Sequence, residues 1–288
     1  MNRYVKSFRP RTLPLSMSGI ILGSGLAYPV VENKPRFWVV FALAIATTLS
    51  LQILANIANE LGDADHGTDD NQAGREAYGL QSGAITKQEM IRCMYCFVAL
   101  CICFGTALVW TSFRTLLCLE SVIFLLLGAF AIGGAIKYTY GKHNYGYVGL
   151  GDLGVFIFFG LLSTMGSYYL QAHTLTLDAS LCAVAIAMPI VGVLNLNNIR
   201  DIDNDKKHGK NTFAGLLGVK GGKIYHTVLM IICFGLFAVL RHYWTLLAIP
   251  IIVWHLIYIW QHEGATLDRQ MPVLMFTTIG IAMLACIV

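Results

Sequence analysis

The chain has 288 residues, of which 56% are hydrophobic and only 12% are charged. Soluble domains carry about 25% charged residues, so this composition excludes an ordinary soluble domain. The formal net charge of +4 is small, and we attribute it to orientation in a membrane rather than to nucleic-acid binding.

Nine long runs with at most one charge follow one another along the chain, and we interpret each as a transmembrane helix. Their lengths are close to the ~17–25 residues that cross a bilayer. The runs cover residues 12–31, 37–59, 93–113, 115–136, 153–177, 179–199, 224–240, 243–262 and 270–288. The sequence therefore predicts an all-α, polytopic membrane protein with one domain over residues 1–288.

Lys and Arg residues are distributed unevenly over the segments between these runs. If the N-terminus is cytoplasmic, 16 of the 20 basic residues lie on the cytoplasmic side, as the positive-inside rule requires. The sequence looks bacterial, so we expect the bacterial inner membrane, with the N-terminus and the loops that carry the candidate functional residues in the cytoplasm. The long loops on that side should cap a cytoplasm-facing cavity between the nine helices. The three loops that should form this cap cover residues 60–92, 137–152 and 200–223, and a fourth cytoplasmic loop covers residues 261–269.

Eight cysteines are scattered along the chain, most of them inside apolar runs. Cys93 and Cys96 have the spacing of a metal or redox pair, but no second pair or ligand histidine accompanies them. We interpret the cysteines as small hydrophobic residues.

Two short clusters at the ends of apolar runs, 56–70 and 195–205, contain 8 of the 16 acidic residues. Carboxylates that crowd at a membrane boundary resist ionisation unless a cation joins them. Mg²⁺ is bound by a few carboxylates and usually shares its other positions with phosphate oxygens. The two clusters therefore suggest a Mg²⁺ site for a phosphate-bearing ligand.

Helical spacing places several residues of each cluster on one face. In the first cluster these are Asn56, Asn59, Glu60 and Asp63. We expect Gly67 to end this helix, which lets Asp69 and Asp70 fold back. In the second cluster the residues that share a face are Asn198, Asp201 and Asp205, whereas Arg200 and Asp203 point elsewhere.

Other acidic residues have simpler interpretations. Glu76, Glu89, Glu263 and Asp268 are interpreted as solvated residues at helix ends. Asp152 precedes an apolar run. Its position is equally compatible with a helix N-cap and with a role in the site.

Several motifs resemble those of the UbiA superfamily of intramembrane prenyltransferases, over essentially the whole chain. Asn59-Glu60-x-x-Asp63 resembles the first acidic motif of this family, although Glu60 stands where the family usually has Asp. Asp201-x-x-x-Asp205 resembles the second motif. Gly67-Thr68-Asp69 is similar to a variant found in the branch that acts on 1,4-dihydroxy-2-naphthoate. Further similarity lies in residues 9–14, 138–142, 149–153, 197–205 and 209–212.

The resemblance implies an enzyme that uses Mg²⁺ to transfer a polyprenyl group from polyprenyl diphosphate to 1,4-dihydroxy-2-naphthoate. Diphosphate and CO₂ would leave, giving a demethylmenaquinol, with the prenyl tail among apolar helices and membrane lipid. The catalytic residues implied are Asn59, Asp63, Asp201 and Asp205. The metal ligands implied are Glu60, Asp63, Asp69, Asp201 and Asp205. The substrate-binding residues implied are Asn56, Arg75, Tyr138, Lys142, Asn198, Arg200 and Lys210.

Two alternatives remain at this stage. A UbiA-type enzyme could act on another acceptor, such as 4-hydroxybenzoate. A divalent-cation transporter would also place acids in a membrane domain, but transporters usually bind their ions near the bilayer midplane rather than at one face.

Overall fold

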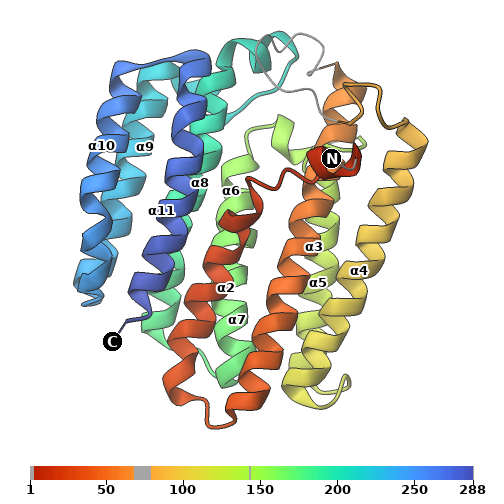
Figure 1. Cartoon of the computed structure of the whole chain (residues 1–288), viewed down its shortest axis with the longest axis vertical. Helices are drawn as coiled ribbons and strands as arrows, with labels where there is room; N and C mark the ends of the chain where they lie inside the picture. Colours follow the sequence, from red (N-terminus) through yellow and green to blue (C-terminus); the bar gives the residue numbers. More distant parts are fainter. Residues whose placement is uncertain (1–2, 68–78, 143, 288) are drawn as a thin grey trace.

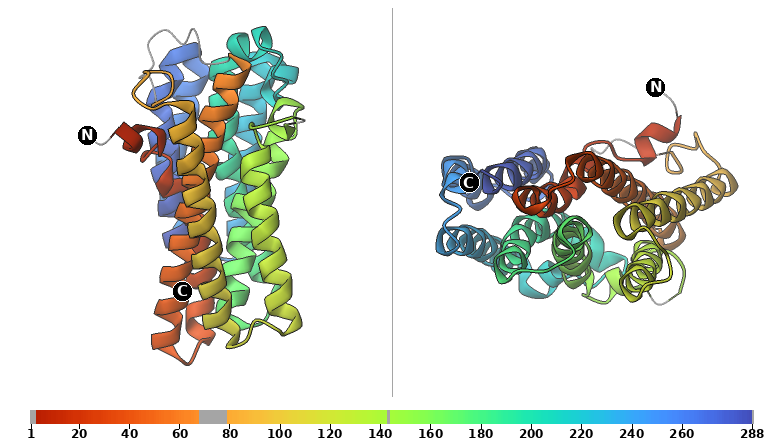
Figure 2. Two further views of the ribbon diagram at one scale, coloured as in Figure 1. Left: turned by 90° about the vertical axis from the view of Figure 1, so that its right-hand side faces the viewer. Right: turned by 90° about the horizontal axis from the view of Figure 1, so that it is seen from below.

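The computed structural model describes residues 3–67, 79–142 and 144–287 and shows an elongated bundle of helices that run along its long axis (Figures 1 and 2). No β-strand occurs in these residues. The helices are α1 (Arg3–Ser7), α2 (Leu13–Ala27), η1 (Tyr28–Val30), α3 (Lys34–His66), α4 (Lys87–Phe113), α5 (Leu119–Lys137), η2 (Tyr145–Tyr147), α6 (Gly151–Val155), η3 (Phe156–Leu162), α7 (Ser163–Ala172), α8 (Leu177–Lys207), α9 (Phe213–Val239), η4 (Tyr243–Ala248), α10 (Ile249–Gln261), η5 (Gly264–Arg269) and α11 (Gln270–Ala285).

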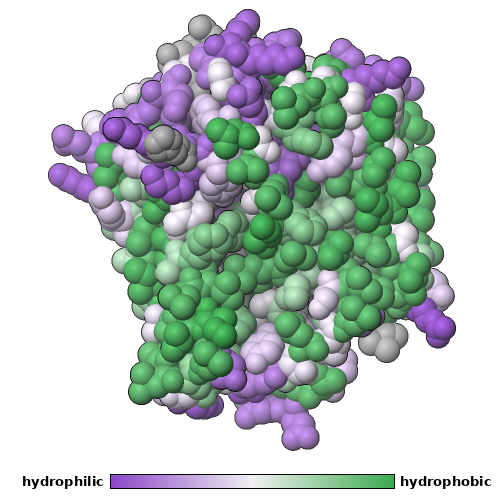
Figure 3. All heavy atoms as spheres, turned by 180° about the vertical axis from the view of Figure 1, so that it is seen from behind, coloured by the Kyte–Doolittle hydropathy of each residue, from purple (hydrophilic) through white to green (hydrophobic). Residues whose placement is uncertain are grey.

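The described residues contain eight helical segments that are long and apolar enough to cross a membrane. Helix α11 is a shorter ninth apolar helix, so the arrangement agrees with the nine predicted spans. The fifth span is continuous over Gly151–Ala172 and joins α6, η3 and α7; its middle part, η3, is a π-helix. On the face drawn in Figure 3, apolar side chains form a broad band between two more polar ends. The chain is therefore an integral membrane protein.

Small residues let α2 approach the fifth span very closely. A Cβ atom added to Gly19 would lie 1.9 Å from Ser163 Oγ, and one added to Gly23 would lie 2.1 Å from the carbonyl oxygen of Thr164. A larger side chain at Gly23 would push against the backbone of the fifth span, and one at Gly19 would displace the side chains of Ser163 and Thr164. Contacts between small residues are typical of membrane bundles, where no hydrophobic effect drives helices together.

A buried chain of polar side chains links α8, α9, α10 and α11. His255 Nδ1 lies 2.8 Å from Gln270 Oε1, and the Nε2 atoms of His226 and His255 are 3.0 Å apart. Asn195 Nδ2 donates to Gly222 O and lies 3.4 Å from His226 Nδ1. If His255 donates from Nδ1 and His226 from Nε2, every contact has one donor and one acceptor and both imidazoles are neutral. Polar groups buried in a membrane domain need such partners.

Two helices continue beyond their apolar runs and carry the acidic clusters. Helix α3 extends to His66 and ends at Gly67, whose φ of 68° is left-handed, as predicted. Helix α8 extends to Lys207, so much of segments 60–92 and 200–223, predicted as loops, is helical. Both clusters lie at one end of the bundle, which we call the acidic end (top of Figure 1).

Candidate active site

A cavity of about 970 Å³ leads from the acidic end into the bundle. On α3 its lining residues run from Ala44 to Asp63, a distance of about 28 Å at a rise of ~1.5 Å per residue. Charged side chains line it at the acidic end, and small or apolar side chains line its deeper part. The cavity could therefore hold a ligand with an anionic head and a long apolar tail.

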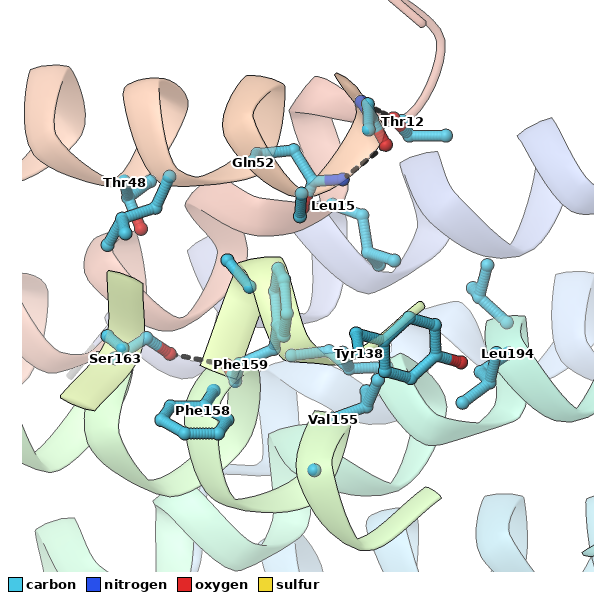
Figure 4. A pocket seen from close by; sticks show the side chains of 18 of the residues that line it. Thr12, Leu15, Thr48, Gln52, Tyr138, Val155, Phe158, Phe159, Ser163 and Leu194 are labelled. Atoms are coloured by element: carbon cyan, nitrogen blue, oxygen red, sulfur yellow. Dashed lines mark hydrogen bonds between the residues drawn. The ribbon is translucent and has the colours of Figure 1, made fainter. Parts of the chain in front are cut away.

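Aromatic side chains form much of one wall of the cavity (Figure 4). Phe158 and Phe159 come from η3, and Tyr138 follows α5 at the same wall. Gln52 from α3 and Thr12 before α2 lie on the opposite side. Aromatic faces attract cations, so this wall could stabilise a carbocation that forms beneath the acidic end.

Helix α3 contributes Asn56, Asn59 and Asp63 to the cavity. Asn59 Oδ1 accepts a hydrogen bond of 2.6 Å from the Thr139 hydroxyl, and Asp63 Oδ1 accepts one of 3.0 Å from the Tyr147 hydroxyl. The Asn56 amide donates to Phe8 O and to the hydroxyl of Thr12. Asn56 therefore holds the N-terminal segment against α3 at the mouth of the cavity.

Helix α8 contributes an arginine-centred network. Arg200 donates to both carboxylate oxygens of Asp201, at 2.9 and 2.7 Å, and to Asn197 Oδ1 at 2.5 Å. It also pairs with Asp268. All four side chains line the cavity. The predictions that Arg200 points elsewhere and that Asp268 is merely solvated are therefore wrong, because η5, which directly precedes α11, packs against α8.

Lys210 joins the two acidic clusters. Its ammonium lies 3.7 Å from Asp205 Oδ1 and also interacts with Asp63 and Asp201. Burial lowers the pKa of Lys210, but these carboxylates outweigh that effect and raise it, so the amine stays charged. Asp205 Oδ2 is buried and has no hydrogen-bond partner among the described residues. This oxygen is therefore available to bind a ligand.

Tyr138 lines the cavity beside the same carboxylates. Burial, and then the charges of Asp152, Asp63 and Asp205, raise the pKa of its hydroxyl. The hydroxyl therefore stays protonated and can donate a hydrogen bond.

The structure does not bring Glu60 to this cavity. Its side chain is fully buried, and Oε1 accepts a hydrogen bond of 2.7 Å from the backbone N–H of Leu80. Successive residues lie about 100° apart around a helix, so Glu60 sits at the edge of the face that carries Asn59 and Asp63, and the segment after residue 78 binds it there.

We expect Glu60→Gln to keep turnover within a few-fold of the wild type, because Gln still offers an oxygen to the N–H of Leu80. Diphosphate release by the purified variant would measure this. If the rate of diphosphate release instead fell as far as it does when a carboxylate that lines the cavity is removed, Glu60 would count as a metal ligand.

Three further candidates do not line the cavity. Lys142 is exposed and Asn198 is buried, and neither lines the cavity. Asp152 does not cap α6, whose N-cap is Leu150; it hydrogen-bonds with Tyr225 instead. The candidates Asp69 and Arg75 fall outside the described residues.

Sequence reasoning missed several residues of the site. Asn197 lines the cavity in place of Asn198, and the shared spacing Asn59-x-x-x-Asp63 and Asn197-x-x-x-Asp201 could have identified it. Lys6, Arg9 and Arg11 also line the mouth. In the sequence their charge indicates orientation, and residues 9–14 add to the family resemblance, but neither pattern predicts that these side chains reach the cavity.

Comparison with protein families finds a match to the UbiA prenyltransferase family over residues 16–280. The chain is 41% identical to 1,4-dihydroxy-2-naphthoate octaprenyltransferase of Escherichia coli, covering 93% of this chain and 88% of that protein. It is 38% identical to the protein of the same name from Haemophilus influenzae, covering 88% and 83% of the two chains.

Solved structures of low sequence identity share the fold. A UbiA homolog from Aeropyrum pernix superposes with a TM-score of 0.70 at 19% identity, covering 93% of this chain and 94% of its own. A UbiA homolog from Archaeoglobus fulgidus, solved with GPP and Mg²⁺, superposes with a TM-score of 0.67 at 14% identity over the full length of both chains.

Proposed function

The chain belongs to the UbiA prenyltransferase family, and on that premise we propose that it prenylates 1,4-dihydroxy-2-naphthoate. The donor is a polyprenyl diphosphate, the products that leave are diphosphate and CO₂, and the prenylated product is a demethylmenaquinol. The names and high coverage of the two bacterial relatives support this choice of acceptor.

The observation that carries the proposal is the meeting of both acidic clusters with Lys210 above a deep apolar cavity. The diphosphate head would lie at the acidic end, and the prenyl tail would lie along the apolar walls. The excess of Lys and Arg in the segments at this end supports a cytoplasmic orientation of the site, in a bacterial inner membrane.

The residues at the acidic end fit a hard divalent cation. Asp63, Asp201 and Asp205 offer only oxygen donors, which Mg²⁺ prefers, and Asp205 has a buried oxygen without a partner among the described residues. These three carboxylates would hold the ion. When bound, Mg²⁺ neutralises charge on the departing diphosphate.

The protein's own groups perform the remaining work. Lys210 attracts the diphosphate and balances the negative charge that grows on it. Arg200 orients the Asp201 carboxylate through two hydrogen bonds. The protonated hydroxyl of Tyr138 can donate to an oxygen of the donor or of the acceptor. Phe158 and Phe159 shield the allylic cation from water until the electron-rich naphthoate ring attacks it.

Diphosphate release by the protein purified in detergent tests this function. We expect Mg²⁺-dependent release, with CO₂, when a polyprenyl diphosphate and 1,4-dihydroxy-2-naphthoate are both present. A parallel reaction contains 4-hydroxybenzoate as acceptor. Release with the benzoate alone would keep the family chemistry and discard the proposed acceptor, whereas no Mg²⁺-dependent release with either acceptor would contradict a prenyltransferase.

A further inference from the structure

A second cluster of metal-ligating side chains lies at the opposite end of the bundle from the acidic end. It consists of Asp178, Cys182 and His242. Within the part of the chain that the structure describes, it is the one group of three His, Cys, Asp or Glu side chains whose ligand atoms all lie within 4.8 Å of one another.

Local structure brings these three side chains together. Asp178 and Cys182 are one turn apart at the start of α8, so they share a face. His242 lies in the link between α9 and η4, where its N–H donates to Phe237 O and its carbonyl oxygen accepts from Thr245. Its ring also lies against that of Phe237. The imidazole is therefore held beside α8 by the turn that ends α9.

The contacts differ from those of a catalytic Cys–His–Asp relay. In a relay, the nucleophile contacts one ring nitrogen of the histidine and the acid contacts the other. Here the same atom, His242 Nε2, lies 3.4 Å from Cys182 Sγ and 3.5 Å from Asp178 Oδ2. Three donor atoms that surround one point are the arrangement of a metal site.

The separations agree with tetrahedral zinc. Zinc binds thiolate sulfur at about 2.3 Å and binds nitrogen or oxygen at about 2.1 Å, so tetrahedral angles place sulfur roughly 3.6 Å from either atom and nitrogen roughly 3.4 Å from oxygen. The observed separations are 3.4 Å for Sγ–Nε2, 4.0 Å for Sγ–Oδ2 and 3.5 Å for Nε2–Oδ2. The one long separation involves Asp178, whose side chain is 51% exposed and can turn inward.

We propose that Asp178, Cys182 and His242 bind Zn²⁺, with water in the fourth position. A thiolate and an imidazole favour zinc over the hard ion expected at the acidic end. The buried Cys182 thiol would lose its proton on binding, and solvent reaches the ion past Asp178. The ion would tie the start of α8 to the turn after α9. This site is separate from the proposed prenyl transfer and does not depend on it.

Co²⁺ is a suitable probe because its bond to a thiolate gives a charge-transfer band in the near ultraviolet. The full-length protein in detergent is stripped with EDTA and titrated with Co²⁺ in excess Mg²⁺. No cysteine is among the described residues that line the cavity at the acidic end, so cobalt bound there gives no such band. We expect saturation at one Co²⁺ per chain and loss of the band when Zn²⁺ is added.

Variants assign the band to the cluster. Cys182→Ala should abolish it, and Asp178→Asn and His242→Gln should each weaken Co²⁺ binding at least tenfold. Asp178 is exposed, so its replacement leaves the core intact. Cys233→Ala removes a thiol that is equally buried on α9 and should leave the band unchanged. Absence of a band in the wild type, or its persistence in folded Cys182→Ala, would overturn the proposal.

Discussion

Asp201→Asn is expected to lower the rate of diphosphate release by about 10²–10³-fold or more, the size of loss that follows removal of one preorganised charge-stabilising group. Asp201 lines the cavity, and Arg200 holds both of its carboxylate oxygens. Asn keeps the shape and one oxygen but loses the charge that a metal ion needs. The measurement is initial rate of diphosphate release at saturating Mg²⁺, with gel filtration in detergent to show that the variant is folded.

Asp203→Asn is the matched control for this prediction. Asp203 lies on the same helix two residues away, but it is exposed and does not line the cavity. The same chemical change there should leave the rate within a few-fold of the wild type. Equal rates for the two variants would mean that the Asp201 carboxylate has no part in turnover.

Lys210→Gln is expected to reduce kcat/KM for the polyprenyl diphosphate by about 10²-fold, because the site loses a cation that faces the anionic head in a buried place. The lysine side chain is only 13% exposed and interacts with carboxylates of both clusters. Initial rates of diphosphate release at varied concentrations of the polyprenyl diphosphate would give kcat/KM. The change should be smaller for the acceptor, whose KM is measured separately.

Lys207→Gln controls for the loss of one positive charge near the site. Lys207 ends α8 and is exposed, and exposed charges are well screened by salt. We expect this variant to differ little from the wild type. If Lys210→Gln changes kcat/KM no more than Lys207→Gln does, Lys210 serves only to neutralise its neighbouring acids.

The membrane spans and the shared end of the two acidic clusters could be predicted from the sequence. Hydrophobic runs of bilayer length locate spans because each spanning backbone must satisfy its own hydrogen bonds. An even number of spans between two clusters returns the chain to the same face. Helical spacing then predicted that Asp63, Asp201 and Asp205 face one common cavity, and all three residues line it.

The edges of each helical face could not be predicted in this way. Glu60 and Asn198 directly follow the lining residues Asn59 and Asn197 in the sequence. The direction of each side chain depends on what packs beside it. For Glu60 this is the N–H of Leu80, twenty residues along the chain. Asp268 pairs with Arg200 across sixty-eight residues, and helical periodicity carries no information about such contacts.

The side chains that lie beside Cys182 could not be predicted from the sequence for the same reason. Cys182 is fully buried, as a small hydrophobic residue would be. Its neighbour His242 lies sixty residues away in the sequence, beyond the spacing of any short ligand motif. Only the turn after α9 brings the imidazole to the thiol.

The close contact of Gly19 and Gly23 with the fifth span bears on how the protein behaves outside a bilayer. Attraction across this contact comes from dispersion forces and polar atoms at short range. Exclusion of water contributes little to it, so replacing lipid with a mild detergent leaves these short-range attractions in place. We therefore expect this contact to survive solubilisation. The cavity of the protein in a detergent micelle should then have the same shape as in the membrane.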